Sequence, residues 1–229
     1  MTPTEGYIKF ECIWERQPIP AEDALLRRLS TLRNTLVDMG LIGLYPDGIG
    51  YGNVSIRNPR GPGFFITGTA TGGLKSLSRE HYAWVTDYSV PENRVVCRGL
   101  VQASSESLTH AGLYEARPRV GCVVHVHSEH LWRSLAFRIP TTERTCEYGT
   151  PELSEAIRHL GRSGLNDAGI IVLGGHEEGL LCYGIGETSA LSQLHNAKRL
   201  LAQAARGARE WRFWNAGRWP PRARNEVKP

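Results

Sequence analysis

The sequence predicts an α/β protein in which one central β-sheet is covered by helices. Segments with apolar residues at helical spacing are interspersed, in unequal runs, with short apolar segments bounded by Gly and Pro. The length of 229 residues suits one well-buried domain and is short for two. A composition of 41% hydrophobic and 22% charged residues excludes a disordered chain, a coiled coil and a collagen-like polymer.

The first half of the chain contains one long helix followed by short strands. The helix is expected over residues 22–39 and ends at Gly40. Its apolar face carries leucines at helical spacing, namely Leu25, Leu29, Leu32 and Leu36. Strands are expected over residues 52–57 and 63–68, and residues 77–88 should form a helical turn that leads into a strand.

The second half alternates helices with more apolar strands. A helix opens at Ser104-Ser105-Glu106 and runs to about Arg117. Another begins at Pro151, because proline is favoured in the first turn of a helix, and extends to Leu160. Strands are expected over residues 120–126, 169–173 and 179–183, and a last long helix over residues 187–205.

Composition also constrains the compartment. No run approaches the roughly 18 apolar residues of a membrane span, and the N-terminus lacks the apolar core of a secretory signal. The 5 cysteines are scattered and form no CxxC pair, which favours free thiols in a reducing compartment over disulfides or a thiolate zinc site. We therefore expect a cytoplasmic protein without a membrane partner.

The last 24 residues differ from the rest of the chain. Residues 206–229 hold seven basic and two acidic residues, so the formal net charge of +4 divides into about +5 in this tail and about −1 in residues 1–205. The tail also carries aromatic side chains, namely Trp211, Phe213, Trp214 and Trp219. Such a mixture suits nucleic acid, but the body offers no basic surface to continue it. We favour packing of the tail onto the body or onto a neighbouring subunit.

A cluster of histidines indicates a metal site. His125 and His127 lie two positions apart on an expected strand, so both imidazoles project from the same face. His176 follows another strand, and Glu106 lies at the start of the helix that precedes the histidine pair. Three nitrogen ligands with an open position suit a catalytic zinc or a similar divalent ion. The alternative is that these histidines are core residues satisfied by packing.

The motifs GNVSIR, FFITG, ASSE, VVHVHS, EYGTPELSEAI and GGHEEGLLCYG occur in this order over roughly residues 25–205. In order and spacing they resemble the class II aldolase/adducin family of metal-dependent sugar-phosphate enzymes. The resemblance implies a three-layer αβα fold with a central, mainly antiparallel sheet. It also implies a domain over residues 1–205, a separate tail over residues 206–229, and a fourfold-symmetric homotetramer.

The same resemblance assigns roles to individual residues. It implies that His125, His127 and His176 bind Zn²⁺ or another divalent ion such as Mn²⁺, Fe²⁺ or Co²⁺, and that Glu106 is the catalytic acid/base. The implied substrate-phosphate contacts are Asn53, Thr67, Gly68, Ser104 and Ser105. A helix start with hydroxyls and free N–H groups does favour anions. Alternatively, the serines only cap the helix and Asn53 only forms a turn.

The activity implied is cleavage of a carbon–carbon bond in a small phosphorylated sugar or keto compound, through retro-aldol or related enediolate chemistry. At the position of Glu106 the epimerase branch of the family has Asp. The glutamate in this chain therefore favours a lyase over an epimerase. A dehydratase or decarboxylase on the same scaffold is the first alternative. A non-catalytic, adducin-like interaction protein is the second, although such chains have lost metal ligands that are present here.

Three departures from the family pattern bear on the substrate. The usual His-Gly motif is extended here to His176-Glu177-Glu178-Gly179. The added acids either tune the metal or face solvent, and we expect the latter for Glu178. The motif ITPSG is replaced by ITGTATGG, which adds glycines beside the expected phosphate loop. No tyrosine follows Tyr183, so the family's C-terminal proton donor is absent. Tyr114, Tyr148 and a neighbour's tail are candidates to replace it.

Overall fold

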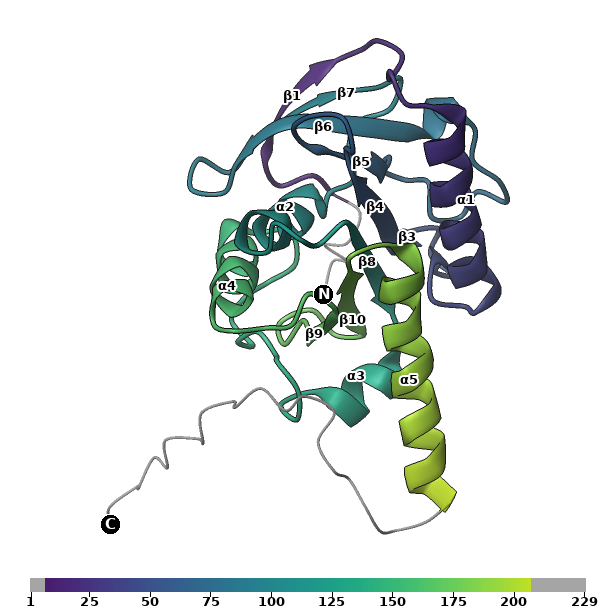
Figure 1. The fold of residues 1–229 in the computed structure, drawn as a ribbon, viewed down its shortest axis with the longest axis vertical. Helices are drawn as coiled ribbons and strands as arrows, with labels where there is room; N and C mark the ends of the chain where they lie inside the picture. Colours follow the sequence, from purple (N-terminus) through teal and green to yellow (C-terminus); the bar gives the residue numbers. More distant parts are fainter. Residues whose placement is uncertain (1–6, 207–229) are drawn as a thin grey trace.

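An eight-stranded β-sheet forms the centre of the molecule in the computed structural model, which describes residues 7–206 (Figure 1). In spatial order the strands are β1 (Glu11–Glu15), β7 (Arg94–Arg98), β6 (Tyr82–Ser89), β5 (Phe64–Thr67), β4 (Asn53–Arg57), β8 (Cys122–His127), β10 (Gly179–Gly184) and β9 (Gly169–Val172). A separate hairpin pairs β2 (Gly43–Leu44) with β3 (Gly50–Tyr51).

Antiparallel pairing dominates this sheet. Strands β1 and β7 pair in parallel at one edge, and every other neighbouring pair of these eight strands runs antiparallel. In the centre, the register sets Asn53 of β4 opposite His125 of β8 and Gly179 of β10 opposite His127. The mainly antiparallel sheet that the sequence predicted is therefore confirmed.

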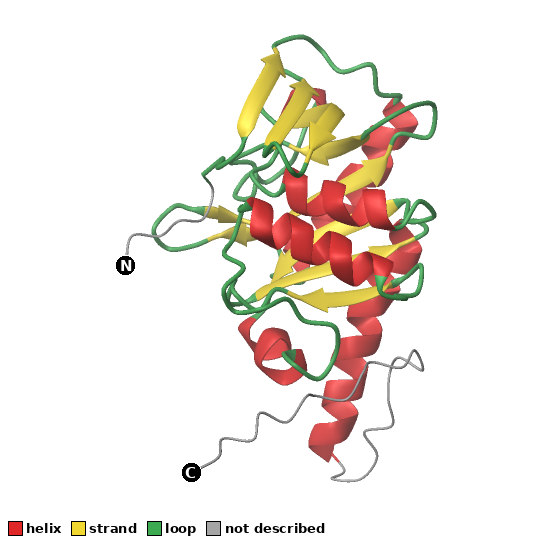
Figure 2. Cartoon of the chain, turned by 90° about the vertical axis from the view of Figure 1, so that its left-hand side faces the viewer, coloured by secondary structure: helices red, strands yellow, loops and turns green. Residues whose placement is uncertain are grey.

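Helices cover both faces of the sheet, which confirms the three-layer αβα architecture (Figures 1 and 2). Helices α1 (Asp23–Asp38), α3 (Glu129–Leu135) and α5 (Glu187–Arg206) pack on one face, and α2 (Ser107–Ala116) and α4 (Pro151–Arg162) pack on the other. Alternation along β8 serves both layers, because Val124 and Val126 join the first core and Val123 joins the second. Burying each such side chain contributes about 1.5–3 kcal/mol.

The elements with regular apolar spacing lie close to where the sequence placed them. The four leucines predicted for the face of α1 are all buried against the sheet, and Gly40 follows the helix with a left-handed φ of 68°. The sequence analysis identified neither the edge strand β1, nor its neighbour β7, nor the β2–β3 hairpin. Their side chains are largely half-buried or exposed, so their apolar pattern is weak.

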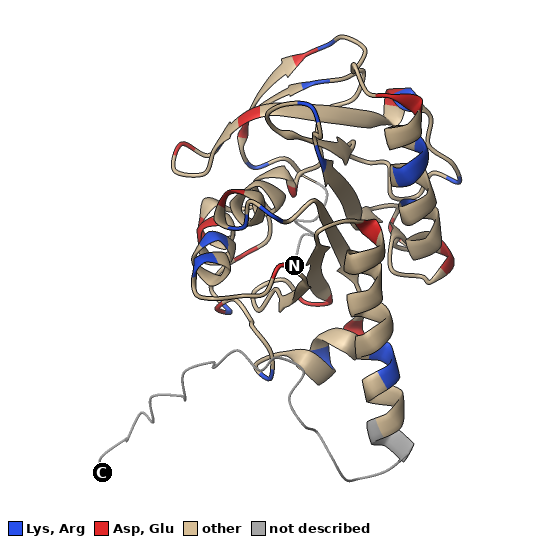
Figure 3. Cartoon of the chain, viewed as in Figure 1, with Lys and Arg blue, Asp and Glu red and all other residues tan. Residues whose placement is uncertain are grey.

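Charged residues of both signs are distributed over the helices and outer strands (Figure 3). Several pair across elements: Arg28 binds Glu187 and so joins α1 to α5, and Arg158 binds Glu115 and joins α4 to α2. Among residues 7–206, no helix combines the length and apolar character that a membrane span requires. The expected role of the basic tail concerns residues 206–229, of which all but Arg206 lie outside the described residues.

Candidate active site

Three histidines from two parts of the chain converge at the centre of the sheet. His125 and His127 project from the face of β8 that carries α2 and α4, and His176 lies in the turn between β9 and β10. The Nε2 atoms of His125 and His127 lie 3.0 Å apart, and the Nε2 atom of His176 lies 3.3 and 3.1 Å from them. All three side chains are buried.

This geometry fits a metal ion. In a tetrahedral zinc site with Zn–N bonds of about 2.0–2.1 Å, neighbouring ligand nitrogens lie roughly 3.3 Å apart. Burial lowers the pKa of His125 well below its usual value, and the nearby His127 and His176 lower it further. Burial, followed by His127 and Lys9, lowers the pKa of His176 in the same way. Both imidazoles are therefore neutral at pH 7, the state in which imidazole binds a metal.

The hydrogen bond on the far side of the His125 ring sets its orientation. The Nδ1 atom lies 3.2 Å from the carbonyl oxygen of Leu180, which can only accept a hydrogen bond. Nδ1 therefore carries the proton, and the lone pair of Nε2 points toward the other two histidines. This is the tautomer that a metal bound through Nε2 requires.

One expectation about the third-histidine turn was wrong. Glu178 does not simply face solvent, because its carboxylate accepts a hydrogen bond of 2.9 Å from the hydroxyl of Tyr45. That hydroxyl lies 2.7 Å from Nδ1 of His127. The family pattern could not reveal this contact, because Tyr45 lies in the hairpin that the sequence analysis did not identify.

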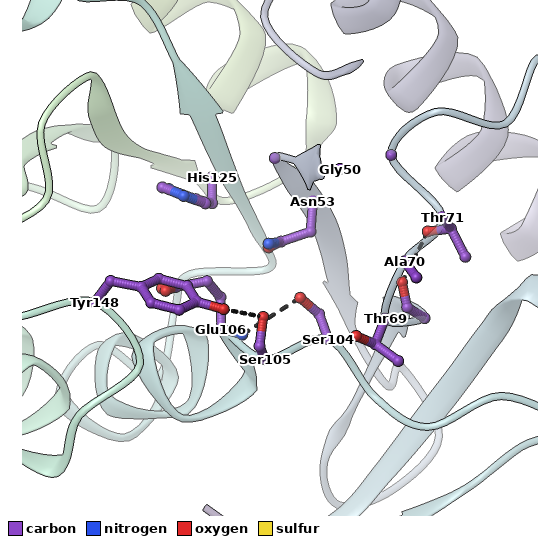
Figure 4. A pocket seen from close by; sticks show the side chains of 13 residues that line it. Gly50, Asn53, Thr69, Ala70, Thr71, Ser104, Ser105, Glu106, His125 and Tyr148 are labelled. Atoms are coloured by element: carbon purple, nitrogen blue, oxygen red, sulfur yellow. Dashed lines mark hydrogen bonds between the residues drawn. The ribbon is translucent and has the colours of Figure 1, made fainter. Parts of the chain in front are cut away.

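A polar pocket of about 350 Å³, including its open mouth, begins at His125 (Figure 4). Its walls come from the β3–β4 junction, the loop after β5, the start of α2 and the turn before α4. The lining residues are Gly50, Gly52, Asn53, Gly68, Thr69, Ala70, Thr71, Gly72, Ser104, Ser105, Glu106, His125 and Tyr148. The pocket therefore joins one of the three histidines to a glycine-rich loop and a helix start.

Four of the five residues expected to contact a phosphate line this pocket, namely Asn53, Gly68, Ser104 and Ser105. Thr67 does not line it, because its hydroxyl accepts a hydrogen bond of 3.2 Å from the backbone N–H of Val54. Ser104 also has a local role, since its Oγ accepts from the backbone N–H of Glu106 at 3.3 Å. Oγ of Ser105 likewise accepts a hydrogen bond, from the hydroxyl of Tyr148 at 2.5 Å.

Gly52 explains how Asn53 comes to lie beside His125. Its φ of +77° belongs to the left-handed region, which favours glycine. A Cβ at this position would lie 2.7 Å from Cγ1 of Ile42 and 3.1 Å from the carbonyl oxygen of His125. The chain can therefore turn into β4 this close to the histidine only with glycine at position 52.

Glu106 is the carboxylate of the pocket. It is the N-cap residue of α2, with 1% of its surface exposed, and lines the same cavity as His125. Figure 4 shows it close to Tyr148 and Ser105. A buried carboxylate at a helix N-terminus is a suitable acid/base group for a substrate that enters this cavity.

The two tyrosines considered as proton donors lie in different surroundings. Tyr148 lines the pocket, donates a hydrogen bond of 2.5 Å to Oγ of Ser105, and stacks its ring 5.1 Å from that of His176. Tyr114 of α2 instead lies fully buried against β4, where its hydroxyl is 2.8 Å from Oγ of Ser55. Of these two, only Tyr148 can reach a molecule in the pocket.

A buried arginine holds the glycine-rich loop in place. Arg33 of α1 is 1% exposed, and its guanidinium donates to the carbonyl oxygens of four loop residues. The acceptors are Gly72 at 2.9 Å, Leu74 at 2.5 Å, Thr71 at 3.3 Å and Lys75 at 3.5 Å. Burial lowers the pKa of Arg33 from its ordinary value, yet a guanidinium stays charged at pH 7. Sequence reasoning missed this residue, whose only signal is an arginine within an apolar helix stripe.

Replacing Arg33 by methionine is expected to destabilise the protein by about 2–4 kcal/mol, because it leaves several loop carbonyls without a donor. The charge that favours an anion in the adjacent pocket is lost as well. Urea unfolding measures the first effect, and protection from unfolding by inorganic phosphate measures the second. Arg33→Lys is the matched control, since it keeps the charge but cannot reach as many carbonyls. An unchanged unfolding midpoint in Arg33→Met would contradict the structural role.

Comparison with known proteins places this arrangement in a family. Residues 47–204, more than half of the chain, match the family model described as the class II aldolase and adducin N-terminal domain. The chain belongs to the class II aldolase and adducin family. Enzymes of this family generally depend on a divalent metal, and in this member the three histidines form a group that could hold one.

Solved structures described as aldolases, or as candidate aldolases, share the fold. The L-fuculose-1-phosphate aldolase of Thermus thermophilus is 19% identical, with a TM-score of 0.58 over 84% of this chain and 100% of its own. YgbL from Klebsiella pneumoniae, a candidate aldolase/epimerase/decarboxylase, is 18% identical, with a TM-score of 0.60 over 84% and 94%. A sugar-phosphate aldolase of Thermotoga maritima is 15% identical, with a TM-score of 0.60 over 82% and 97%. At these identities the likeness concerns the fold alone.

Proposed function

We propose that this protein is a divalent-metal-dependent lyase that cleaves a carbon–carbon bond in a small phosphorylated sugar or keto compound. The observation that carries the proposal is the convergence of three imidazole nitrogens within 3.0–3.3 Å at one end of a pocket. The pocket also holds Glu106 and a glycine-rich loop. His125, His127 and His176 would hold the ion, which would be Zn²⁺ or another divalent metal such as Mn²⁺, Fe²⁺ or Co²⁺.

The other end of the pocket supplies an anion site. Ser105 and Asn53, the backbone of Gly68–Gly72 and the N-terminus of α2 surround it. The charge of Arg33 lies behind the loop, one peptide group from the cavity. A substrate phosphate bound there would leave the remainder of a short chain to extend toward His125.

Retro-aldol cleavage then assigns a task to each group. The hydroxyl on the carbon that becomes the aldehyde loses its proton, the carbon–carbon bond breaks, and its electron pair stays on the other fragment as an enediolate. Glu106 moves a proton at the enediolate carbon. Tyr148, which lines the pocket, would take up the proton that the substrate hydroxyl loses and pass its own proton to Oγ of Ser105. A divalent ion in the histidine site supplies Lewis-acid stabilisation of the developing negative charge.

Two alternative functions differ in whether they need the histidines and Glu106. A dehydratase or decarboxylase would employ the same histidines and Glu106 and differ only in the bond that breaks. An adducin-like interaction protein would need neither, and the buried, converging histidines argue against it. Assembly into a homotetramer stays a prediction.

A substrate screen tests the proposal. Protein loaded with Zn²⁺, Mn²⁺ or Co²⁺ is expected to release an aldehyde from at least one ketose 1-phosphate or related keto phosphate, and none after treatment with a chelator. Mass spectrometry of the products separates cleavage from loss of water or of CO₂. Dehydration or decarboxylation without aldehyde release would replace the lyase by the first alternative. Failure to bind any of these metals would instead favour the interaction protein.

A further inference from the structure

Two segments that lie far apart in the sequence meet at one metal-ligand candidate, His127. One is the β2–β3 hairpin, where Tyr45 directly follows β2. The other is the His176–Gly179 turn, which carries two acidic residues in place of the usual His-Gly sequence. Both approach the side of the His127 ring that faces away from the other two histidines.

The hydrogen-bond chain at this point has one arrangement of protons. The hydroxyl of Tyr45 lies 2.7 Å from Nδ1 of His127 and donates to a carboxylate oxygen of Glu178 at 2.9 Å. Because this hydroxyl has a single proton and gives it to Glu178, its oxygen can only accept from His127. Nδ1 of His127 therefore carries the proton, and the lone pair of Nε2 faces His125 and His176.

Glu178 makes this contact from an unfavourable backbone conformation. Its φ of +69° is left-handed, a conformation that favours glycine over a residue with a Cβ. Glu177, the neighbouring acid, is exposed, whereas Glu178 is half-buried with its carboxylate 3.9 Å from Nδ1 of His127. Tyr45 is held by its neighbour Tyr51, whose ring lies 4.5 Å away and packs on His127 at 5.3 Å.

We infer that Tyr45 and Glu178 are positioning residues that fix the tautomer and ring orientation of His127 for metal binding. The Glu178 carboxylate acts through the hydroxyl of Tyr45 and makes the His127 imidazole a stronger metal ligand. Carboxylates that are hydrogen-bonded directly to metal-binding histidines have the same effect. This inference rests on the proposed function, because it concerns the same histidine site. It adds Tyr45, which lies outside the family motifs, and Glu178, which replaces part of the usual His-Gly sequence.

Cobalt binding to the metal-free protein tests it without relying on activity. Titration with Co²⁺, followed by its visible absorption, gives an affinity, and competition with a chelator gives a dissociation rate. Tyr45→Phe keeps the ring that packs on Tyr51 and removes only the hydroxyl. It is expected to weaken Co²⁺ binding about 10–100-fold, the usual effect of losing such a partner. The unfolding midpoint of the metal-free variant should match that of the wild type.

Glu178→Ala and Glu177→Ala form a matched pair. The first should weaken Co²⁺ binding and speed Co²⁺ release, while the second should leave both unchanged. Glu178→Gln keeps an oxygen that accepts from Tyr45 and should lie between Glu178→Ala and the wild type. Equal Co²⁺ affinity in the wild type, Tyr45→Phe and Glu178→Ala would overturn the positioning role. Failure of the wild type to bind Co²⁺ would instead overturn the proposed metal site itself.

Discussion

Replacing His127 by alanine is expected to abolish metal binding and lyase turnover together while the chain stays folded. The wild type should contain about one divalent ion per chain, and a site reduced from three nitrogen ligands to two should retain almost none after dialysis. Folding should survive because the lost imidazole is one of three crowded rings whose mutual contacts contribute little in the absence of a metal. Elemental analysis, circular dichroism and aldehyde release measure the three quantities.

His159→Ala is the matched control for this variant. His159 lies on α4, is exposed, and belongs to no part of the histidine cluster. It should leave metal content and turnover at wild-type levels. Full metal occupancy in His127→Ala would remove His127 from the ligand set, and with it the main support for the proposed function.

The fold could be predicted wherever burial imposes a period on the sequence. The helix expected over residues 22–39 is α1, Asp23–Asp38, because its leucines all face one apolar layer. The strand expected over residues 120–126 is β8, Cys122–His127, which is buried on both faces. In both cases local sequence and tertiary packing require the same pattern.

The edge of the sheet formed by β1 could not be predicted in this way. Side chains of β1 alternate between exposed and half-buried, so its apolar signal is weak. Its partner β7 lies far along the chain, and β1 pairs with it in parallel rather than through a hairpin. Long-range pairing of this kind leaves no local pattern to read.

The candidate site likewise contains residues that the sequence could predict and residues that it could not. Two histidines at strand spacing place two imidazoles on one face, so His125 and His127 could be paired from the sequence. The convergence of His176 with them depends on the β8–β10 register; its place after a strand made it a candidate third ligand, and the family resemblance assigned it that role. Arg33, Tyr45 and Glu178 act through contacts between distant segments, which neither spacing nor the family motifs contain.

Replacing Glu106 by glutamine is the second decisive change. The variant should keep its metal and its fold but lose turnover by a factor of about 10²–10⁴, the usual contribution of a general acid/base. Glutamine has nearly the same shape as glutamate and cannot exchange a proton at pH 7. Glu106 is 1% exposed, so bulk solvent cannot substitute for it.

Glu115→Gln provides the comparison on the same helix, since Glu115 points outward and pairs with Arg158 and Arg162. It should cost a little stability and no turnover, because such pairs contribute about 0–1 kcal/mol at a surface.

The metal content of Glu106→Gln separates the two ways in which Glu106 could matter. If Glu106→Gln loses its metal along with turnover, the carboxylate acts as a ligand. If it keeps both, the proton moves through another group, and Tyr148 becomes the first to replace.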